Sequence, residues 1–330
     1  MTDRKLDRVA VTGGAGFLGG ALITRLIDDG VSVAALARTP AKLSRFDGQI
    51  DIVPGDLADE TAIARAADGA DAVLHLAALT HARTRAAFGA ANIEGSANVA
   101  RGAFAAGAFL VAVSSIAARQ PELSDYAASK AGGEAATLAA ARAHDKRMGA
   151  ETNQAARARW AILRAPALYG PNDGATLPLL KAVRFGIAPA PAHKPAPRAS
   201  ILYVDDMAAA IVSAAREAPA GVVYDVGDER PEGRTWAEIA ADLGVAMGRK
   251  PLVAPMPKPL LLAQAAVQEL IAHARGEAAF VSRGKIREFF HPDWVAGEPS
   301  LAAATSWAPT TPLVEGFAKT LKWYQERGLI

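Results

Sequence analysis

The sequence predicts an α/β fold, in which a doubly wound parallel sheet carries helices on both faces and a smaller, mostly helical C-terminal lobe follows. Between residues 8 and 226, short apolar runs alternate with stretches that repeat apolar residues at helical spacing. A glycine-rich turn joins the first apolar run to the first helical stretch. From residue 235 onward the chain reads as helices. A length of 330 residues allows one large α/β unit or two lobes.

These patterns predict the elements in chain order. Strands are expected at residues 8–11, 31–37, 50–53, 72–76, 109–115, 160–164 and 222–226. Helices are expected at residues 17–29, 126–148, 207–216, 236–243, 259–274 and 313–327. Proline and turn signals predict irregular backbone at residues 186–198 and 251–257. The helix at residues 259–274 lacks a clean apolar stripe, which suggests burial on several sides.

The composition excludes several kinds of site and partner. The chain has no cysteine, which excludes disulfides, thiolate zinc sites and cysteine nucleophiles. No cluster of metal ligands is apparent in the sequence, so no metal is predicted. The formal net charge of +2 gives no reason to expect nucleic acid or an anionic membrane as a partner. A polar N-terminal segment and the lack of a membrane-length apolar run predict a cytoplasmic protein.

The turn after the first strand carries the strongest signal in the chain. A strand that turns sharply into a helix leaves the first backbone N–H groups of the helix unpaired, and a pyrophosphate can satisfy them. Glycine permits this close approach, and the spacing fits Gly14-x-Gly16-x-x-Gly19 or Gly13-x-x-Gly16-x-x-Gly19. The predicted dinucleotide-binding residues at this turn are Gly13, Gly16, Phe17, Leu18 and Gly19.

The chain is predicted to form two domains, of which the first contains the glycine-rich turn. Residues 1–166, with residues 201–226 returning to them, form the predicted dinucleotide-binding Rossmann domain. Residues 167–200 and 227–330 form the predicted substrate-binding lobe.

The end of the second strand indicates which cofactor is bound. An acidic side chain at this place accepts hydrogen bonds from the ribose 2′-hydroxyl of NAD, whereas an arginine suits the 2′-phosphate of NADP. The sequence offers Arg38 and no Asp or Glu in Ala37-Arg38-Thr39-Pro40. NADP is therefore favoured and NAD is possible, while a solvated loop arginine is the alternative interpretation.

Two residues at later strand ends have open roles. Asp56 follows the third strand and either meets the adenine or caps the helix that starts near Asp59. His81 follows the fourth strand, at the sheet edge where ligands bind in open α/β sheets. His81 either contacts the substrate or lies in an exposed loop. His75 lies inside the strand and is expected to belong to the core.

Ser115, Tyr126 and Lys130 form the predicted catalytic set. Tyr126 and Lys130 stand four residues apart at the start of a helix, so they share one helical face. An ammonium beside a phenol stabilises the phenolate, which would lower the pKa of Tyr126 toward neutrality. Ser115, at the end of the fifth strand, is placed to hydrogen-bond the same substrate oxygen.

With these residues in order, the chain resembles the extended branch of the short-chain dehydrogenase/reductases, the NAD-dependent epimerase/dehydratase family. The matching segments are Thr12–Gly19, Gly55-Asp56-Leu57, His75-Leu76-Ala77-Ala78, Asn92-Ile93-Glu94-Gly95-Ser96, Ser114-Ser115, Tyr126 with Lys130, Arg164-Ala165-Pro166, Tyr169-Gly170-Pro171 and Tyr203-Val204-Asp205-Asp206. The resemblance implies that Tyr126 transfers a proton, that Lys130 also holds the nicotinamide ribose, and that Ser115 orients the substrate oxygen. It also implies that Asp56, Leu57 and Ala77 lie at the cofactor.

The leading functional hypothesis is an NADP-preferring oxidoreductase that moves a hydride between nicotinamide and a carbonyl or alcohol substrate. The first alternative is a nucleotide-sugar epimerase or dehydratase, and the second is a non-catalytic dinucleotide-binding subunit. Sugar epimerases place a diphosphate-binding arginine where this chain has Ala199, with Arg198 one step away. Only ten residues separate Ser115 from Tyr126, which shortens the usual loop.

Two further features leave alternatives open. The proline-rich segment 186–198 is either a lip over the substrate pocket or a plain surface connection. Gly132 and Gly133 lie in the helix that starts at Tyr126, and interior glycines weaken a helix by about 1 kcal/mol each. Close packing against a second copy in a homodimer, or against the cofactor site, would account for them.

Overall fold

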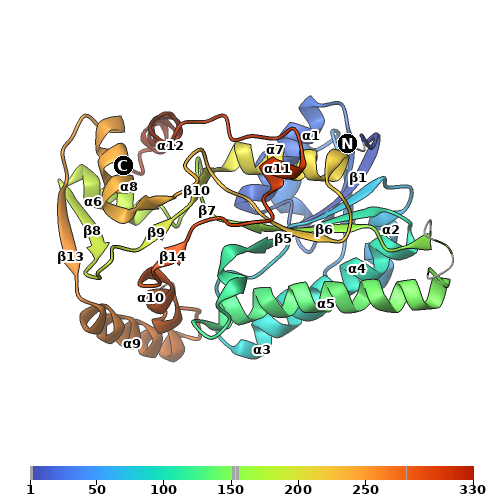
Figure 1. Ribbon diagram of the computed structural model, residues 1–330, viewed down its shortest axis with the longest axis horizontal. Coiled ribbons are helices and arrows are strands. Elements are labelled where there is room, and N and C mark those ends of the chain that lie inside the picture. The colour runs from blue at the N-terminus through green and yellow to red at the C-terminus, as the bar shows by residue number, and fades with distance from the viewer. Residues whose placement is uncertain (1–2, 151–152, 154–155, 280) are drawn as a thin grey trace.

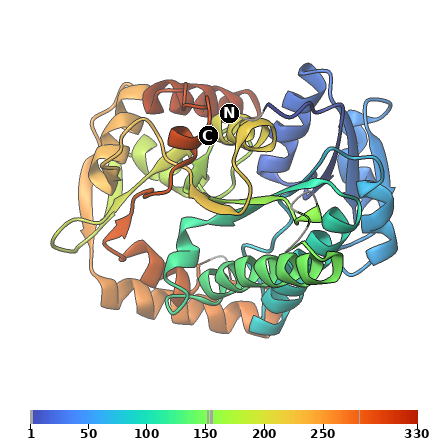
Figure 2. The same ribbon diagram turned by 45° about the vertical axis from the view of Figure 1, so that its right-hand side comes forward.

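The main sheet of the protein is parallel and seven-stranded, with helices on both faces (Figure 1, Figure 2). The computed structural model describes residues 3–150, 153, 156–279 and 281–330. The strand order is β3 (Asp51–Pro54), β2 (Ser32–Ala37), β1 (Arg8–Thr12), β4 (Ala72–His75), β5 (Phe109–Ser115), β6 (Trp160–Ala165) and β11 (Val222–Asp225). Every neighbouring pair runs parallel. The predicted doubly wound sheet is confirmed, since the chain winds outward from β1 in both directions.

Two layers of helices bury the sheet on both faces. On one face lie α1 (Phe17–Asp28) and α7 (Val204–Glu217), which pack against each other (Figure 1). On the other face lie α2 (Glu60–Ala67), α4 (Gly95–Ala105) and α5 (Asp125–Met148). One apolar cluster fills each interface, and the strands supply residues to both clusters. Burial on both faces explains why these strands read as continuous apolar runs.

A smaller lobe lies at one end of the main sheet and contains most of the C-terminal chain (Figure 1, Figure 2). Its helices are α6 (Leu177–Arg184), α8 (Trp236–Ala246), α9 (Lys258–Arg275), α10 (Arg283–Phe289) and α12 (Leu313–Glu326). Its strand pairs are β7 (Ala167–Tyr169) with β10 (Ile201–Tyr203), and β8 (Ile187–Pro191) with β13 (Leu252–Met256). A third small sheet holds β9 (Arg198–Ala199) between β12 (Arg234–Thr235) and β14 (Asp293–Trp294). The helical C-terminal region is confirmed, with these short strands added to it.

The remaining elements connect the larger ones. Two short helices, α3 (Arg85–Phe88) and α11 (Leu301–Ala304), lie between longer segments. Two 3-10 turns occupy η1 (Pro40–Phe46) and η3 (Ile116–Arg119), and a π-helical segment occupies η2 (Gly89–Glu94).

Two segments that were expected to be irregular form a strand pair instead. β8 lies within the proline-rich stretch and β13 within the turn-rich one, and they pair in parallel with Leu252 opposite Ile187. Proline lacks a backbone donor, but each strand of a two-stranded ladder needs donors on one side only. The prolines of these segments are therefore compatible with a strand pair at the edge of the lobe.

The expectation that the helix near residues 259–274 is buried on several sides is also wrong. Of the residues of α9, only Ala265 is fully buried, where it packs with Ile286 and Phe290 of the α10 region. Large apolar residues such as Leu260 and Leu270 are more than half exposed. Within the part of the chain that the structure describes, no helix combines the length and apolarity needed to cross a membrane.

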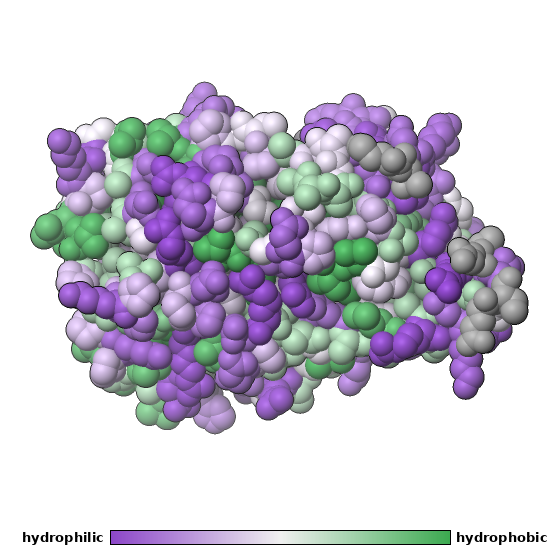
Figure 3. All heavy atoms as spheres, viewed as in Figure 1, coloured by the Kyte–Doolittle hydropathy of each residue, from purple (hydrophilic) through white to green (hydrophobic). Residues whose placement is uncertain are grey.

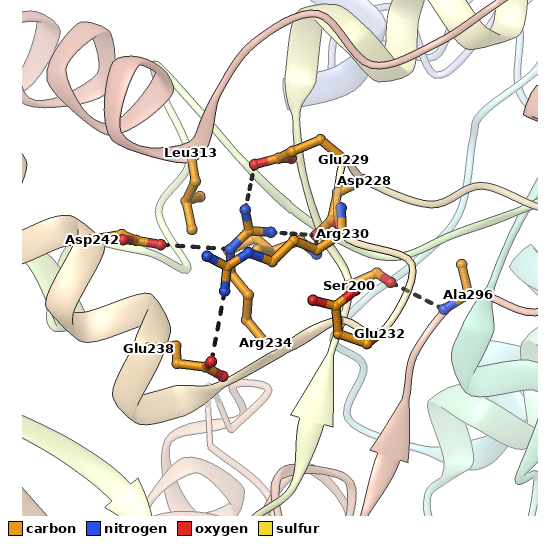
Figure 4. A network of polar contacts seen from close by, with 12 residues as sticks. Ser200, Asp228, Glu229, Arg230, Glu232, Arg234, Glu238, Asp242, Ala296 and Leu313 are labelled. Carbon is orange, nitrogen blue, oxygen red and sulfur yellow. Dashed lines mark hydrogen bonds and ion pairs between the residues drawn. The ribbon is translucent and has the colours of Figure 1, made fainter.

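A buried ion network holds the small three-stranded sheet of this lobe to α8. The guanidinium of Arg234 is almost fully buried and pairs with Asp228 at 3.0 Å, with Asp242 at 3.5 Å and with Glu229 (Figure 4). Asp228 also accepts the backbone N–H of Ile201 at 2.8 Å. Because every charge in the network has a partner, burial of the arginine is tolerated.

His75 joins three elements at the centre of the main sheet, as the core role predicted for it requires. Its Nδ1 atom lies 2.7 Å from Oγ1 of Thr12 on β1, and its Nε2 atom lies 3.1 Å from Oγ of Ser96 on α4. Burial lowers the pKa of His75 from 6.5 to about 3, with a smaller contribution from the charge of Lys130. His75 is therefore neutral in the folded protein at ordinary pH.

We expect His75 to make the fold sensitive to mild acid. Between pH 6.5 and about 3 the unfolded chain binds a proton at His75 that the folded chain does not, so stability falls as the pH falls. Urea unfolding at pH 7 and pH 5 should show that His75→Asn reduces this loss by about 2 kcal/mol relative to wild type. His193→Asn, at an exposed loop position, is the matched control. An identical pH dependence in wild type and His75→Asn would contradict the prediction.

Candidate functional site

The glycine turn between β1 and α1 is shaped by close backbone contacts. A Cβ atom at Gly13, where φ is +79°, would lie 2.6 Å from the backbone nitrogen of Ala77. A Cβ atom at Gly19 would lie 2.1 Å from the carbonyl oxygen of Gly13. These two glycines therefore allow the turn to fold back against β4 and against its own helix. A Cβ atom at Gly16 would meet the Gly13 oxygen tightly, at 3.3 Å, and no other atom within 4 Å, so the other sides of this position are open.

The N-terminus of α1 fits a pyrophosphate group. Gly16 is the N-cap residue and supplies no side-chain cap, and the first turn carries no acidic side chain. Phe17 and Leu18 occupy that first turn, so their N–H groups belong to the unpaired set at the start of the helix. The positive end of the helix dipole and an open approach at Gly16 suit a phosphate anion. The residues predicted for the dinucleotide thus fit the group by their backbone geometry.

The remaining cofactor candidates also lie at the carboxyl edge of the sheet. Arg38 directly follows β2 and is exposed. Ala77 follows β4, and its backbone N–H donates to Oγ1 of Thr12 at 3.3 Å. Asp56 follows β3, where its carboxylate accepts the backbone N–H of Ala58 at 2.9 Å. The helix cap at α2 is Asp59 and not Asp56, which leaves the adenine role of Asp56 as a prediction.

Leu57 contributes packing next to the same edge. Its side chain lies against Gly95 of α4, where a Cβ atom would come within 2.7 Å of Leu57 Cδ1. Its carbonyl oxygen accepts a hydrogen bond from Asn98 at 2.7 Å. A direct contact between Leu57 and the cofactor stays a prediction.

Ser115 and Tyr126 are brought together at the adjoining strand end. Ser115 is the last residue of β5, and Tyr126 lies in the first turn of α5. Their side-chain hydroxyl groups lie close enough that Ser115 lowers the pKa of Tyr126. Ser115 also accepts the backbone N–H of Ala117 at 3.2 Å, which fixes its orientation. Because β1, β4 and β5 are neighbours, this hydroxyl pair and the glycine turn share one edge of the sheet.

Lys130 lies one turn further along α5 and points to the sheet. Its Nζ atom donates to the carbonyl oxygen of Val113 on β5 at 2.8 Å. Burial lowers the pKa of Lys130 to about 8, while the carboxylate of Glu134 opposes this shift. Lys130 is thus half-buried below Tyr126 and is held by the strand.

The pKa of Tyr126 is raised above its ordinary value, contrary to the lowering expected from Lys130. Burial is the largest cause, and the ammonium of Lys285 and the hydrogen bond from Ser115 oppose it. Lys285 belongs to α10, and its Nζ atom lies 5.9 Å from the centre of the Tyr126 ring. Its side chain is 60% exposed, so solvent screens its charge and the effect on Tyr126 is modest.

Sequence reasoning missed Lys285 and its partner Glu288, because no motif marks the C-terminal lobe. Glu288 accepts a hydrogen bond from Lys285 at 3.1 Å and another from the hydroxyl group of Ser124. Ser124 in turn caps α5 by accepting the N–H of Ala127 at 2.9 Å. The C-terminal lobe therefore contacts the helix end that carries Tyr126.

Glu134 is a second residue whose role was missed. It lies four residues after Lys130 on the same face of α5, which is the signal that could have identified it. Its carboxylate accepts a hydrogen bond from Ser114 at 2.6 Å and two from Arg164, at 2.9 and 2.7 Å. This buried pairing anchors α5 to β5 and β6 behind the site.

The interior glycines of α5 are explained within one chain. A Cβ atom at Gly132 would lie 2.5 Å from Ile93, and one at Gly133 would lie 2.5 Å from the carbonyl oxygen of Asn92. Asn92 also donates to Ser129 of α5 at 2.8 Å. The glycines therefore let α5 pack against the π-helical segment η2. A homodimer stays a prediction that these glycines do not require.

A cavity of about 980 Å³ opens beside Tyr126, between the start of α5 and the C-terminal lobe. Phe88 of α3 and Leu270 of α9 supply apolar surface, and Lys285 supplies charge. His81 also lines this cavity, which makes substrate contact sterically accessible to it. Residues 186–198, the predicted lip, are absent from its lining.

The family of the chain follows from comparison with known proteins. A sequence model described as "NAD dependent epimerase/dehydratase family" matches residues 9–227. The chain belongs to this family. It is therefore a nicotinamide-dinucleotide-dependent enzyme of the short-chain dehydrogenase/reductase type, as the order of its motifs predicted. The matched range contains the glycine turn and, apart from Arg8 at the start of β1, all seven strands of the main sheet.

One relative extends the similarity along nearly the whole chain. The ceramide reductase of Caulobacter vibrioides is 36% identical over 323 residues, which cover 97% of this chain and 95% of the relative. A 3β-hydroxysteroid dehydrogenase/Δ5→4-isomerase of Mycobacterium tuberculosis is 43% identical over 75 residues, which are 23% of this chain and 20% of that enzyme.

Several solved structures share the fold of this chain. The crystal structure of gox2253 has a TM-score of 0.72 at 19% identity, covering 98% of this chain and 99% of that one. The UDP-glucose 4-epimerase of Thermus thermophilus, solved with NAD, has a TM-score of 0.69 at 22% identity. The match covers 98% of this chain and 100% of the epimerase chain. At these identities the likeness concerns the fold alone.

We expect Gly16→Ala to separate cofactor binding from folding. Alanine can adopt the backbone of Gly16, where φ is −81° and ψ is 175°, and loss of a glycine N-cap costs roughly 1 kcal/mol. The new methyl group would enter the open space at the helix N-terminus, so dinucleotide affinity should fall about tenfold or more. Titration calorimetry and thermal unfolding measure the two effects. Gly174→Ala, at an open surface position, is the control.

Proposed function

We propose that the protein is an NADP-preferring oxidoreductase that transfers a hydride between nicotinamide and a carbonyl or alcohol carbon, with Tyr126 as the proton donor or acceptor. The single observation that carries this proposal is that the hydroxyl groups of Ser115, at the end of β5, and Tyr126, at the start of α5, lie together on the same sheet edge as the glycine turn. A reacting oxygen needs donors in this arrangement, and the cavity beside Tyr126 gives it access.

The residues of the chain divide the work in this mechanism. The bound dinucleotide supplies the hydride chemistry. The hydroxyl groups of Ser115 and Tyr126 hold the substrate oxygen, and Tyr126 gives its proton to that oxygen during reduction. A raised pKa keeps Tyr126 protonated at neutral pH, which favours its use as a donor. Lys130, which donates to the carbonyl oxygen of Val113, is proposed to support the phenolate that remains and to hold the nicotinamide ribose.

The substrate class that we propose is a ceramide-like lipid. The ceramide reductase of Caulobacter vibrioides is similar to this chain over 97% of its length, including the C-terminal lobe, where the family motifs end. The cavity of about 980 Å³ is large enough for part of a lipid, and it combines apolar walls from Phe88 and Leu270 with polar groups near Tyr126.

The nucleotide-sugar alternative finds less support in the structure. Arg198, the arginine nearest the expected position for a diphosphate, donates to the carbonyl oxygens of Glu232 and Gly233 at 2.8 and 2.7 Å. Arg234 is fully engaged with carboxylates (Figure 4). The second alternative, a non-catalytic subunit, does not explain why the Ser115–Tyr126 pair and Lys130 are all present.

Tyr126→Phe tests the mechanism directly. Removal of the proton donor should lower turnover of a carbonyl substrate by about a hundredfold or more, in line with general-acid contributions. Cofactor affinity should stay within about twofold of wild type, because binding uses the glycine turn. Steady-state rates and cofactor titration give both values. Tyr224→Phe, whose hydroxyl only bonds Pro219, should keep full turnover, and normal turnover in Tyr126→Phe would refute the mechanism.

Arg38→Asp tests the cofactor preference. The substitution removes a cation that suits the 2′-phosphate and introduces a carboxylate that repels it and accepts from the 2′-hydroxyl. The ratio of kcat/KM with NADPH to that with NADH should fall about tenfold or more. Arg65→Asp, at another exposed position near this edge, serves as the charge-matched control. An unchanged ratio would mean that Arg38 does not read the 2′ group.

A further inference from the structure

The exposed apolar side chains of the protein are concentrated on one margin of the C-terminal lobe. Eight of the eleven large apolar residues that the described chain exposes belong to two segments, the end of α6 with β8, and β13 with α9. We call this set the apolar edge: Phe185, Ile187, Leu252, Val253, Leu260, Val267, Leu270 and Ile271. β13 runs directly into α9 along this margin (Figure 1), and apolar atoms gather over β13 in the same view (Figure 3).

The strand half of the apolar edge is continuous across two segments. Leu252 of β13 lies opposite Ile187 of β8, and these side chains are 75% and 50% exposed. Phe185, two residues before Ile187, is 82% exposed. Single exposed apolar residues need no explanation, but a contiguous group of this kind marks a surface that contacts another apolar phase.

The helix half of the apolar edge turns its apolar residues outward. The inner side of α9 is held by the small cluster of Ala265, Ile286 and Phe290. Leu260, Val267 and Ile271 follow one another at spacings of seven and four residues, so they lie on one side of the helix. The single acidic residue of α9, Glu269, pairs with Arg283 at 2.7 Å.

Apart from Glu269 of α9, which pairs with Arg283, the charged residues in the segments that carry the apolar edge are positive. Residues 174–198 and 243–268 contain no Asp or Glu. The exposed basic residues in these stretches are Lys181, Arg184, Lys194, Arg249, Lys250 and Lys258. Exposed apolar side chains flanked by cations, with the one carboxylate of α9 already paired, match the interface of an anionic bilayer, where apolar groups enter the headgroup region and cations meet lipid phosphates.

We propose that the apolar edge docks on the surface of an anionic lipid bilayer and that α9 connects this surface to the active-site cavity. A second copy of the chain fits less well, because a symmetric contact would bring the same cations face to face. Ala266 and Leu270 of α9 line the cavity that contains Tyr126, so an amphipathic molecule leaving the bilayer along α9 reaches the site.

The docking proposal depends only on the exposed residues of the apolar edge, whereas delivery of substrate rests on the proposed reductase function. An anionic membrane was not expected as a partner from the net charge of +2, so this proposal differs from that expectation.

Vesicle binding tests the docking surface. The purified full-length protein is sedimented with two kinds of vesicle. One kind contains only phosphatidylcholine, and the other contains roughly one third phosphatidylglycerol, which gives it an anionic surface. Binding to the anionic vesicles should be about tenfold stronger or more, and it should weaken as salt is added. The triple variant Leu252→Gln/Leu260→Gln/Val267→Gln and the charge variant Arg249→Glu/Lys250→Glu should each lose about tenfold in affinity.

Controls separate docking from folding and from catalysis. Met148→Gln, an exposed apolar position at the far end of α5, should bind vesicles as wild type does, and thermal unfolding checks that every variant folds. Equal binding to both vesicle types, or undiminished binding by the triple variant, overturns the docking proposal. The docking proposal is also overturned if the wild-type protein is a dimer that does not bind vesicles and the triple variant is a monomer.

An activity measurement tests delivery. With a lipid carbonyl substrate embedded in anionic vesicles, the triple variant should lose about tenfold in rate, in proportion to its lost binding. With a short-chain, water-soluble ketone its rate should equal that of wild type, because none of its three positions lines the cavity. Equal rates on the embedded lipid overturn delivery. Failure of wild type to reduce either compound counts against the reductase function, and the vesicle result still decides docking.

Discussion

The anchoring of α5 to β5 through three successive helical turns is the constraint on which the site depends. Tyr126 lies beside Ser115, Lys130 is hydrogen-bonded to the carbonyl oxygen of Val113, and Glu134 is hydrogen-bonded to Ser114 and to Arg164 behind it. Residues four apart share one helical face, so one helix orientation satisfies all three contacts. The hydroxyl groups that we propose for catalysis are thereby fixed against a rigid sheet and not against a loop, which is the condition for precise placement of a reacting oxygen.

The C-terminal lobe completes this arrangement from the other side. Glu288 accepts a hydrogen bond from the cap residue Ser124, and Lys285 lies over the ring of Tyr126. The positive charge that acts on the phenol therefore comes from the C-terminal lobe, through Lys285. Burial nevertheless dominates, and the pKa of Tyr126 is raised. Because residues of the C-terminal lobe line the cavity beside Tyr126, the solvation of this phenol depends on how the lobe sits on α5.

How far the sequence predicts this structure depends on what specifies each part. The seven main strands were predicted to within one residue at each end, because burial on both faces makes them apolar runs separated by turn signals. Ser115 and Tyr126 could be brought together from spacing and strand order alone. Lys285 and Glu288 could not, since they approach Tyr126 through long-range packing that leaves no local pattern. β8 and β13 were missed because proline was taken as a sign of irregular backbone, although an edge strand accepts it.

The misjudged helix α9 has a different cause, which bears on function. Apolar content on several sides of a helix was taken to indicate burial in protein, but Leu260, Val267 and Leu270 are exposed. The same pattern fits a helix whose second apolar environment lies outside the protein. Net charge conceals this possibility, because a value of +2 averages acid-free segments at one margin with acidic residues elsewhere. Where charge is segregated along a chain, its local distribution and not its sum determines which surfaces the protein can approach.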